Sequence, residues 1–520
     1  MTRSTTTTHL LFCLFTFALV NPFSSAFAQE KKFNFVAIGR TDTKSEIITK
    51  AANVVPTTEQ YEWQKMECIA FVHFGMNTFT ETQIGSGHAD PNLFDPTGLD
   101  CDQWARVLKN AGMKMAILTA KHHDGFCLWP SRFTDYSVKS SRWKNGKGDV
   151  VKEFVDACRK HGLKVGLYLS PWDRNNTAYG TPAYNTYLMN QLRELLSNYG
   201  KISEVWFDGY RGPGAKPESY HWHGHYRLIR QLQPDALIAV MGPDVRWVGT
   251  ESGYGRETEW DVIPLDVNGE NISKEEDGDH PLDSIFIPRN YMGDDLGSRD
   301  SLYSASALFW YPAETDVSIR PGWFYDSSQD TSVKSVDQLV DIYFNSVGKN
   351  SVLLLNVPAD KRGLISDYDI KALDGFHRVL KKTFSVNLSS DAIVRHGGEK
   401  GLKYAKLFGD HRFWSGPDNT DTSSLEFDLK GEKTFDVAML QEEITVGQRI
   451  EKFHVDYWDE GGWKKLTEGT TVGYKRLLRF KPVKTSRVRL VIESSRLNPT
   501  LANFGLYMLP ERYVQFSHSE

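Results

Sequence analysis

The segment EVWFDGYRGPG, residues 204–214, ends an apolar run on a charge. Val205, Trp206 and Phe207 are typical of a buried strand, and Asp208 follows them directly. A carboxylate at this position is either a solvated strand end or a functional group. Side chains alternate along a strand, so Trp206 and Asp208 are expected on one side, facing one pocket, and Phe207 on the other.

Strands of this kind recur along the chain and are separated by amphipathic segments. Apolar runs predict six strands, at residues 69–74, 115–119, 163–169, 202–207, 236–241 and 351–360. Helical periodicity predicts helices at residues 101–110, 150–160, 184–198, 225–233 and 337–346. A polar, acidic insertion follows at residues 268–280, and one or two more strands are expected between residues 282 and 325. Strands that alternate with helices form parallel sheets, and eight such strands would close a (β/α)8 barrel.

The composition changes near residue 385 to alternating, aromatic-rich segments. KFHVDYWDE at residues 452–460 and RVRLVIES at residues 487–494 are examples. Period-2 runs separated by turn signals predict an all-β sandwich. The predicted organisation is therefore a signal peptide at residues 1–28, a barrel with an N-terminal lead-in at 29–384, and a sandwich at 385–520. The sandwich is expected to support the barrel or to bind sugar.

The first 28 residues have the pattern of a secretory signal. Arg3 precedes an apolar stretch from Leu10 to Val20, and Ala26, Phe27 and Ala28 form a cleavage pattern. Cys13 lies inside the apolar stretch rather than after the cleavage pattern, which argues against a lipid anchor. The sequence therefore predicts an exported protein, secreted or periplasmic according to its source.

Charge and cysteine usage narrow the function class. The formal net charge is −5, and such a mild acidic balance argues against a nucleic-acid or membrane-surface partner. No later stretch approaches the roughly 18 apolar residues of a membrane span. Beyond Cys13, the cysteines all lie in apolar segments, which favours free thiols over disulfides even in an exported protein: Cys68, Cys101, Cys127 and Cys158.

Polar and aromatic residues follow each predicted barrel strand. In chain order they are His73; His122 and His123; Tyr168, Trp172 and Asp173; Trp206 and Asp208; and Asp244, Arg246, Trp247, Glu251, Glu257 and Glu259. In a parallel barrel the loops after the strands build the active site, so these residues are expected to converge on one rim.

This set could bind a metal ion or a sugar. Adjacent His122 and His123 would point to opposite sides of an extended chain, which disfavours a shared metal. HWHGH at residues 221–225 could place His221 and His225 one helical turn apart, but no other ligand motif accompanies them, so a solvated helix start is favoured. Aromatic rings stack on sugars, while histidines and carboxylates bind hydroxyls. Glycoside hydrolysis needs two carboxyl groups, and Asp208 and one of the following glutamates could supply them.

Several motifs together resemble the α-L-fucosidases of glycoside hydrolase family 29. They are FVHFGMNTFT (71–80), AILTAKHHDGFCLWPS (116–131), VGLYLSPWD (165–173), EVWFDG (204–209), GPDVRWVGTESG (242–253), WYPAETDVSIRPGWFY (310–325) and LLLNVPAD (353–360). The resemblance covers most of the predicted barrel, and the sandwich is similar to the family's layout. The motifs GPDVRW and SIRPGWFY are more similar to those of subfamily B, which prefers α-1,3- and α-1,4-linked fucose on branched, Lewis-type glycans.

The resemblance implies a role for each matching residue. Asp208 corresponds to the catalytic nucleophile, and the residues implied to line the fucose pocket are His73, His122, His123, Tyr168, Trp206 and Trp323. The family is retaining, and Glu251, which follows Trp247 and Gly249, is the chosen acid/base, with Glu257 and Glu259 as alternatives. The family commonly carries Asn where this chain has Thr250.

The expected reaction is a double displacement that needs no metal and no cofactor. Asp208 should be ionised and hydrogen-bonded, Glu251 should sit in drier surroundings, and the two carboxyls should lie about 5 to 5.5 Å apart. The implied substrate is a fucosylated oligosaccharide or glycoconjugate. The alternatives are a broad-specificity fucosidase that includes α-1,2 links, a non-catalytic fucose-binding protein, and a metal-dependent hydrolase.

Overall fold

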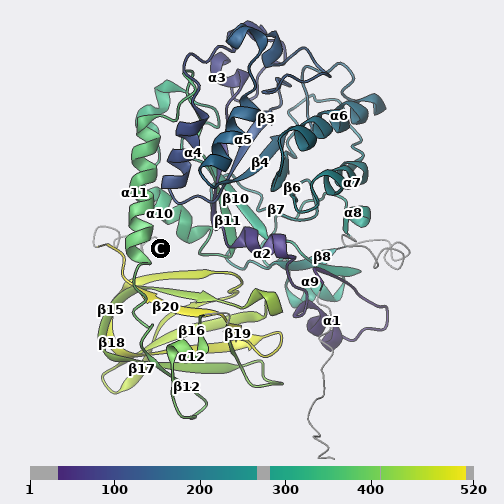
Figure 1. The fold of residues 1–520 in the computed structure, drawn as a ribbon. Coiled ribbons are helices and arrows are strands. Elements are labelled where there is room, and N and C mark those ends of the chain that lie inside the picture. The colour runs from purple at the N-terminus through teal and green to yellow at the C-terminus, as the bar shows by residue number, and fades with distance from the viewer. Residues whose placement is uncertain (1–32, 266–281, 410–411, 511–520) are drawn as a thin grey trace, which may run out of the picture. The chain divides into compact units, whose positions relative to one another are not determined.

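The structure is a computed structural model and describes residues 33–265, 282–409 and 412–510 (Figure 1). The predicted signal peptide, residues 1–28, lies outside the described residues. So does the acidic insertion predicted at residues 268–280.

Eight parallel strands form the sheet that carries the site. In sheet order they are β6 (Leu237–Val240), β5 (Glu204–Phe207), β4 (Lys164–Leu169), β3 (Met115–Lys121), β2 (Cys68–Val72), β11 (Ser351–Asn356), β10 (Ala313–Ser318) and β7 (Arg246–Trp247). A parallel bridge between Ala239 and Val245 brings the two edges together. The sheet is therefore a nearly closed barrel, and the predicted α/β fold class is confirmed.

Helices cover the outside of the barrel (Figure 1). The long ones are α4 (Cys101–Asn110), α5 (Val150–Lys160), α6 (Pro182–Asn198), α7 (Trp222–Leu232), α10 (Val336–Asn345) and α11 (Asp367–Thr383). Shorter helices are α1 (Lys44–Ala51), α2 (Thr58–Gln64), α3 (Met76–Thr80), α8 (Leu282–Ile285) and α9 (Arg299–Tyr303). One more short helix, α12 (Tyr404–Leu407), lies among the strands of the second part of the chain (Figure 1).

Local signals explain why α4 and α5 have the predicted bounds. The side chain of Asp100 accepts a hydrogen bond from the backbone N–H of Gln103, and Asp149 does the same for Lys152. These caps satisfy N–H groups that have no partner within the helix. Both helices stop just before a glycine with positive φ, which terminates a helix at low steric cost.

The last strands of the barrel differ from the prediction. Of the segments between residues 282 and 325, only β10 joins the barrel, because β9 (Ala307–Trp310) pairs antiparallel with β1 (Phe35–Ala37) and β8 (Val262–Leu265). The eighth barrel strand is β7, which the sequence places in a loop. Two residues are too few to show a period-2 pattern, so only the pairing with β10 identifies this strand.

Alternation along the strands divides the core into an inner and an outer layer. Trp206 belongs to the cluster inside the barrel, whereas Phe207 packs in the outer layer, 5.5 Å from the ring of Trp222 in α7. The predicted alternation of Trp206 and Phe207 is confirmed. It directs the next residue, Asp208, to the inner side of the rim.

Two buried carboxyl groups lie inside the barrel beneath that rim. Glu204 accepts a hydrogen bond from the Trp63 indole (2.8 Å), and Glu314 accepts one from the Trp206 indole (2.7 Å). Burial raises the pKa of Glu204 to about 8 and that of Glu314 well above its usual value. Burial therefore favours the neutral form of both acids at pH 7.

The second part of the chain is built mainly of β-strands, as predicted, with one short α-helix, α12, in its described residues. Its main sheet contains β12 (Ile393–His396), β13 (Leu402–Lys403), β15 (Ser423–Gln441), β16 (Ile450–Asp459), β17 (Gly462–Gly469), β18 (Arg476–Ser495) and β20 (Asn503–Tyr507), and a smaller pair joins β14 (Trp414–Ser415) to β19 (Thr500–Leu501). These strands bury their own apolar cluster. The division predicted at residue 385 falls between the end of α11 and the start of β12.

The structure also tests the predictions of free cysteine thiols and of no membrane-spanning helix. Cys68, Cys101, Cys127 and Cys158 are all free thiols, as predicted. Within the described ranges, no helix combines the length and the apolar character that crossing a bilayer requires.

Candidate active site

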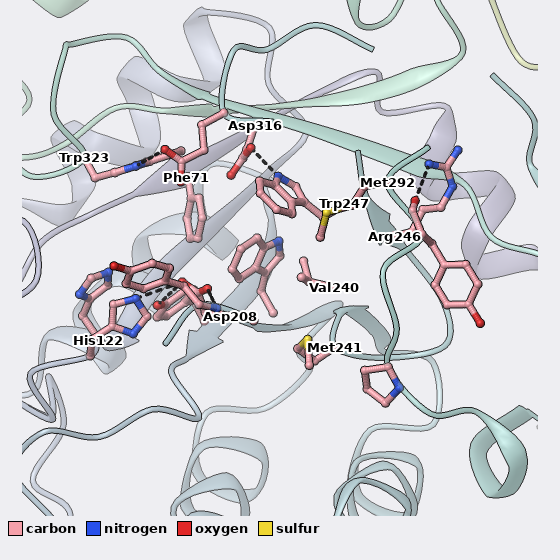
Figure 2. A pocket seen from close by; sticks show the side chains of 18 of the residues that line it. Phe71, His122, Asp208, Val240, Met241, Arg246, Trp247, Met292, Asp316 and Trp323 are labelled. Atoms are coloured by element: carbon pink, nitrogen blue, oxygen red, sulfur yellow. Dashed lines mark hydrogen bonds and ion pairs between the residues drawn. The ribbon is translucent and has the colours of Figure 1, made fainter. Parts of the chain in front are cut away.

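A cavity of about 590 Å³ opens where the barrel strands end (Figure 2). All the site residues implied by the resemblance line it: His73, His122, His123, Tyr168, Trp206, Asp208, Glu251 and Trp323. They come from strand ends and loops far apart in the sequence, so the convergence expected from the parallel topology is observed.

Asp208 is held by donors directed at its carboxylate. The hydroxyl of Tyr168 donates to Oδ2 (2.8 Å), and the backbone N–H of Tyr210 donates to Oδ1 (2.7 Å). The Nε2 atom of His123 lies 3.4 Å from Oδ2. Burial raises the pKa of Tyr168 well above its usual value, so this hydroxyl keeps its proton and remains a donor. These contacts fix the orientation of the Asp208 carboxylate.

The histidines form a neutral wall. Burial is the main cause that lowers the pKa of His73 to about 3, that of His122 well below its usual value, and that of His123 also downward. At pH 7 their rings are neutral, and each ring has one donor and one acceptor nitrogen.

The expectation that His122 and His123 point to opposite sides is wrong. Their ring centroids lie 4.2 Å apart, and both rings line the cavity. The alternation rule holds only for extended chain, whereas β3 ends at Lys121 and a turn begins at this pair. The ring of His122 stacks on Tyr168, and Nδ1 of His123 pairs with Ser170 Oγ (2.7 Å).

Asp173 is an ion-pair partner and not a cavity residue. It binds the buried ammonium of Lys121 (3.0 Å), which also contacts Gln191 (3.0 Å). Trp172 lies behind the site, with its ring 5.0 Å from that of His123. The ion pair between Lys121 and Asp173 joins the end of β3 to the loop after β4 and so supports the turn that carries His122 and His123.

Of the three candidate glutamates, only Glu251 lines the cavity. Glu257 forms ion pairs with Lys349 (2.8 Å) and Arg476 instead. Glu259 is buried against Arg246. The structure therefore favours Glu251 over both alternatives.

Asp244 and Arg246 also serve the fold. Asp244 pairs with Arg230 of α7 (2.7 Å), away from the cavity lining. Arg246 reaches the cavity, but its guanidinium is occupied by Glu259 and by the carbonyl of Tyr311 (3.0 Å).

The surroundings of Glu251 differ from the expectation. Glu251 is exposed on the loop that follows the short strand β7. Its Oε2 accepts a hydrogen bond from the Trp323 indole (3.2 Å), which Figure 2 shows at one side of the cavity. Without a ligand the Glu251 carboxyl is therefore exposed to solvent, and a ligand would have to cover it to exclude water.

Asp316 is a cavity residue that the sequence analysis missed. It lies on β10, is buried, and accepts a hydrogen bond from the Trp247 indole (2.8 Å, Figure 2). Burial is the main cause that raises its pKa to about 8, and the negative charges of Glu251 and Asp208 act in the same direction. The alternation in AETDVS, residues 313–318, is the sequence signal that could have identified it.

No metal centre is found in the described part of the chain, where no three His, Cys, Asp or Glu side chains are suitably grouped. His221 is exposed at the N-cap of α7, and His225 is buried within that helix. Burial lowers the pKa of His225 to about 4. Neither histidine lines the cavity.

Comparison with known proteins adds independent support. A sequence profile described as alpha-L-fucosidase matches residues 41–261 and 279–383, and one described as F5/8 type C domain matches residues 385–507. The chain belongs to the α-L-fucosidase family. It is therefore an enzyme, a glycoside hydrolase of family 29, and its substrates carry L-fucose.

Relatives of this fucosidase span most of its length. Alpha-L-fucosidase 1 of Arabidopsis thaliana is 43% identical over 87% of each chain. A family 29 member from an unknown rumen bacterium is 40% identical, with a TM-score of 0.74, over 89% of this chain and 79% of the other. A Ruminococcus gnavus family 29 fucosidase, solved in complex with fucose, is 32% identical with a TM-score of 0.76, over 89% and 96% of the two chains.

Replacing Asp316 with Asn should extend the activity of the fucosidase to higher pH. The amide keeps an oxygen for the Trp247 indole and is neutral, like the protonated acid. In the parent, Asp316 ionises above pH 8 and then adds negative charge beside Asp208 and Glu251. When each enzyme's kcat/KM at pH 9 is divided by its own value at pH 6, the ratio should therefore be about tenfold higher for the variant than for the parent. The pH profile of kcat/KM measures this. Loss of most activity at pH 6 would show instead that Asp316 acts in its ionised form.

Proposed function

We propose that this α-L-fucosidase is a retaining exo-enzyme in which Asp208 is the nucleophile and Glu251 is the acid/base. The observation that carries the proposal is the environment of Asp208. Tyr168 and the backbone of Tyr210 donate to this carboxylate at the end of a barrel strand, among neutral histidines. Such contacts orient a carboxylate for attack.

The proposed reaction is a double displacement. Asp208 attacks the anomeric carbon of fucose, and Glu251 gives a proton to the leaving oxygen. Glu251 then takes a proton from a water molecule that attacks the fucosyl-enzyme and releases fucose. Positive charge develops at the anomeric carbon in both steps, and the carboxylate of Asp208 stabilises it. A separation of about 5 to 5.5 Å between the two carboxyls stays a prediction.

The exposure of Glu251 fits its role as a group that the substrate covers. The cavity holds fucose on its histidine side, and the rest of the glycan would lie over the mouth where Glu251 meets Trp323. Removal of water there favours the protonated form of a carboxyl group, as an acid catalyst requires.

The proposed substrates are α-1,3- and α-1,4-linked fucosides on branched glycans. The cavity continues past the histidine wall to a second set of lining residues: Met241, Arg289, Asn290, Tyr291 and Met292. These side chains offer apolar surface, an amide and a guanidinium to the sugars that carry fucose. Broad specificity that includes α-1,2 links is the alternative.

Export through the N-terminal segment is also proposed. It rests on the charge, the apolar stretch and the Ala26-Phe27-Ala28 pattern, residues that lie outside the described ranges. Mass spectrometry of the exported protein should find a new N-terminus at Gln29, and retention of Met1 would refute cleavage.

Substitution of the two carboxyls should separate their roles. Asp208→Ala should lower kcat by at least about a thousandfold, because no nucleophile remains. Glu251→Ala should be weak on glycans but active on an aryl fucoside with a good leaving group, and azide should accelerate it by replacing the activated water. Steady-state kinetics with both substrates, with and without azide, measure this.

Glu257→Ala is the matched control for Glu251→Ala. Glu257 follows in the same loop, yet it pairs with Lys349 and Arg476 outside the cavity. This variant should keep parental activity on glycans. Azide rescue of Glu257→Ala rather than Glu251→Ala would move the acid/base role to Glu257.

The linkage preference can be measured directly. Lewis-type trisaccharides should be hydrolysed with at least about tenfold higher kcat/KM than α-1,2-linked 2'-fucosyllactose. Asn290→Ala should weaken hydrolysis of the trisaccharide but not of an aryl fucoside, because only the trisaccharide is expected to reach the second set of lining residues. Equal rates on both oligosaccharides would favour the broad-specificity alternative.

A further inference from the structure

Asn356 is a buried amide that contacts three parts of the site without lining the cavity. It ends strand β11 and is fully buried. Its Oδ1 lies 2.9 Å from Nδ1 of His73 and 3.2 Å from the backbone N of the same residue. Its Nδ2 lies 2.8 Å from the carbonyl oxygen of Trp323 and 2.9 Å from Ser318 Oγ. One side chain therefore joins the ends of β2 and β10 and the turn that carries Trp323.

These partners fix which end of the amide is oxygen. A backbone N–H can only donate, and a backbone carbonyl can only accept. The atom facing the N–H of His73 must therefore be the oxygen, and the atom facing the carbonyl of Trp323 must be the nitrogen. Neither contact depends on the protonation state of the imidazole.

The orientation of the amide determines the tautomer of His73. Because Oδ1 can only accept, Nδ1 of His73 must carry the hydrogen. Burial lowers the pKa of His73 to about 3, so Nε2 carries no proton at pH 7. Nδ1 is already bonded, which leaves Nε2 as the ring nitrogen available to a ligand. It can accept a hydrogen bond from a sugar hydroxyl and cannot donate one.

The same amide holds the turn that carries Trp323. Gln83 Oε1 accepts hydrogen bonds from the backbone N–H groups of Trp323 (2.7 Å) and Phe324 (3.2 Å), so Trp323 is anchored at its N–H and at its carbonyl. The indole of Trp323 then reaches Glu251 Oε2. Its ring centroid lies 5.1 Å from that of His73.

We propose that Asn356 is a positioning residue of the fucose site. It holds His73 as the neutral Nδ1–H tautomer, an acceptor towards the sugar, and it anchors Trp323 beside Glu251. The proposal rests on the proposed function, because it assumes that fucose lies against His73 and that Glu251 is the acid/base. Asn356 does not touch the sugar and acts only through these two neighbours.

The tautomer can be observed in the parent enzyme without substrate. Nitrogen-15 NMR of histidine-labelled protein, with His73 assigned by loss of its signals in His73→Gln, should show a protonated Nδ1 and an unprotonated Nε2 from about pH 5 to pH 8. A protonated Nε2, or titration of the ring near its ordinary pKa, would overturn the proposal. This measurement needs no activity, so failure of the Asp208 and Glu251 assignments would be seen separately.

Asn356→Asp tests the link to catalysis. The change keeps size and Oδ1 but replaces the donor to Trp323 with a carboxyl oxygen. It should lower kcat/KM on a fucosylated glycan by about ten- to a hundredfold. His73 should also gain a second proton at pH 7, visible in its nitrogen-15 shifts, because a carboxylate beside the ring favours the imidazolium.

Asn350→Asp is the matched control. Asn350 is also buried, and it bonds Asp261 (3.1 Å) and the backbone N of Tyr474 (2.7 Å), away from the cavity. Its substitution should lower the denaturation midpoint yet leave the His73 signals and kcat/KM at parental values. Equal losses of kcat/KM in the two variants would reduce Asn356 to a structural role and refute the proposal. So would unchanged His73 signals in Asn356→Asp.

Discussion

The hydrogen bond from the Trp206 indole to the buried carboxyl of Glu314 ties β5 to β10 through the interior of the barrel. Trp206 precedes Asp208 by two residues, and Glu314 precedes Asp316 by two, so each acid follows a bonded residue on the same side of its strand. One contact therefore sets where both acids emerge into the cavity. Because Glu314 is neutral, this contact fixes the floor of the site without burying a charge there.

Burial keeps most of the cavity wall around Asp208 neutral. The histidines lose their protons, and Asp316 keeps its own. An oriented carboxylate among neutral donors and acceptors suits a reaction in which positive charge develops at the anomeric carbon. The buried ion pair of Lys121 with Asp173 lies behind the histidine turn and holds the loops rather than the sugar.

Prediction from the sequence succeeded where the signal for an element lies in a few neighbouring residues. The bounds of α4 and α5 follow from an aspartate cap and a terminal glycine, and Asp208 stands out because a charge ends an apolar strand. It failed at β7, which is only two residues long, and at His122 and His123, where a turn replaces extended chain. Asp316 and Asn356 were missed as site residues because their roles depend on partners more than thirty residues away in the sequence.

The sequence by itself determined the succession of strands and helices, the family motifs and the acid at the end of β5, because these depend on neighbours along the chain. Only the tertiary structure decided which of three glutamates reaches the cavity, since ion pairs with Lys349, Arg476 and Arg246 remove the other two. It also decided the protonation of the site. Burial and hydrogen-bond partners set those pKa values, and both arise only when distant loops pack together.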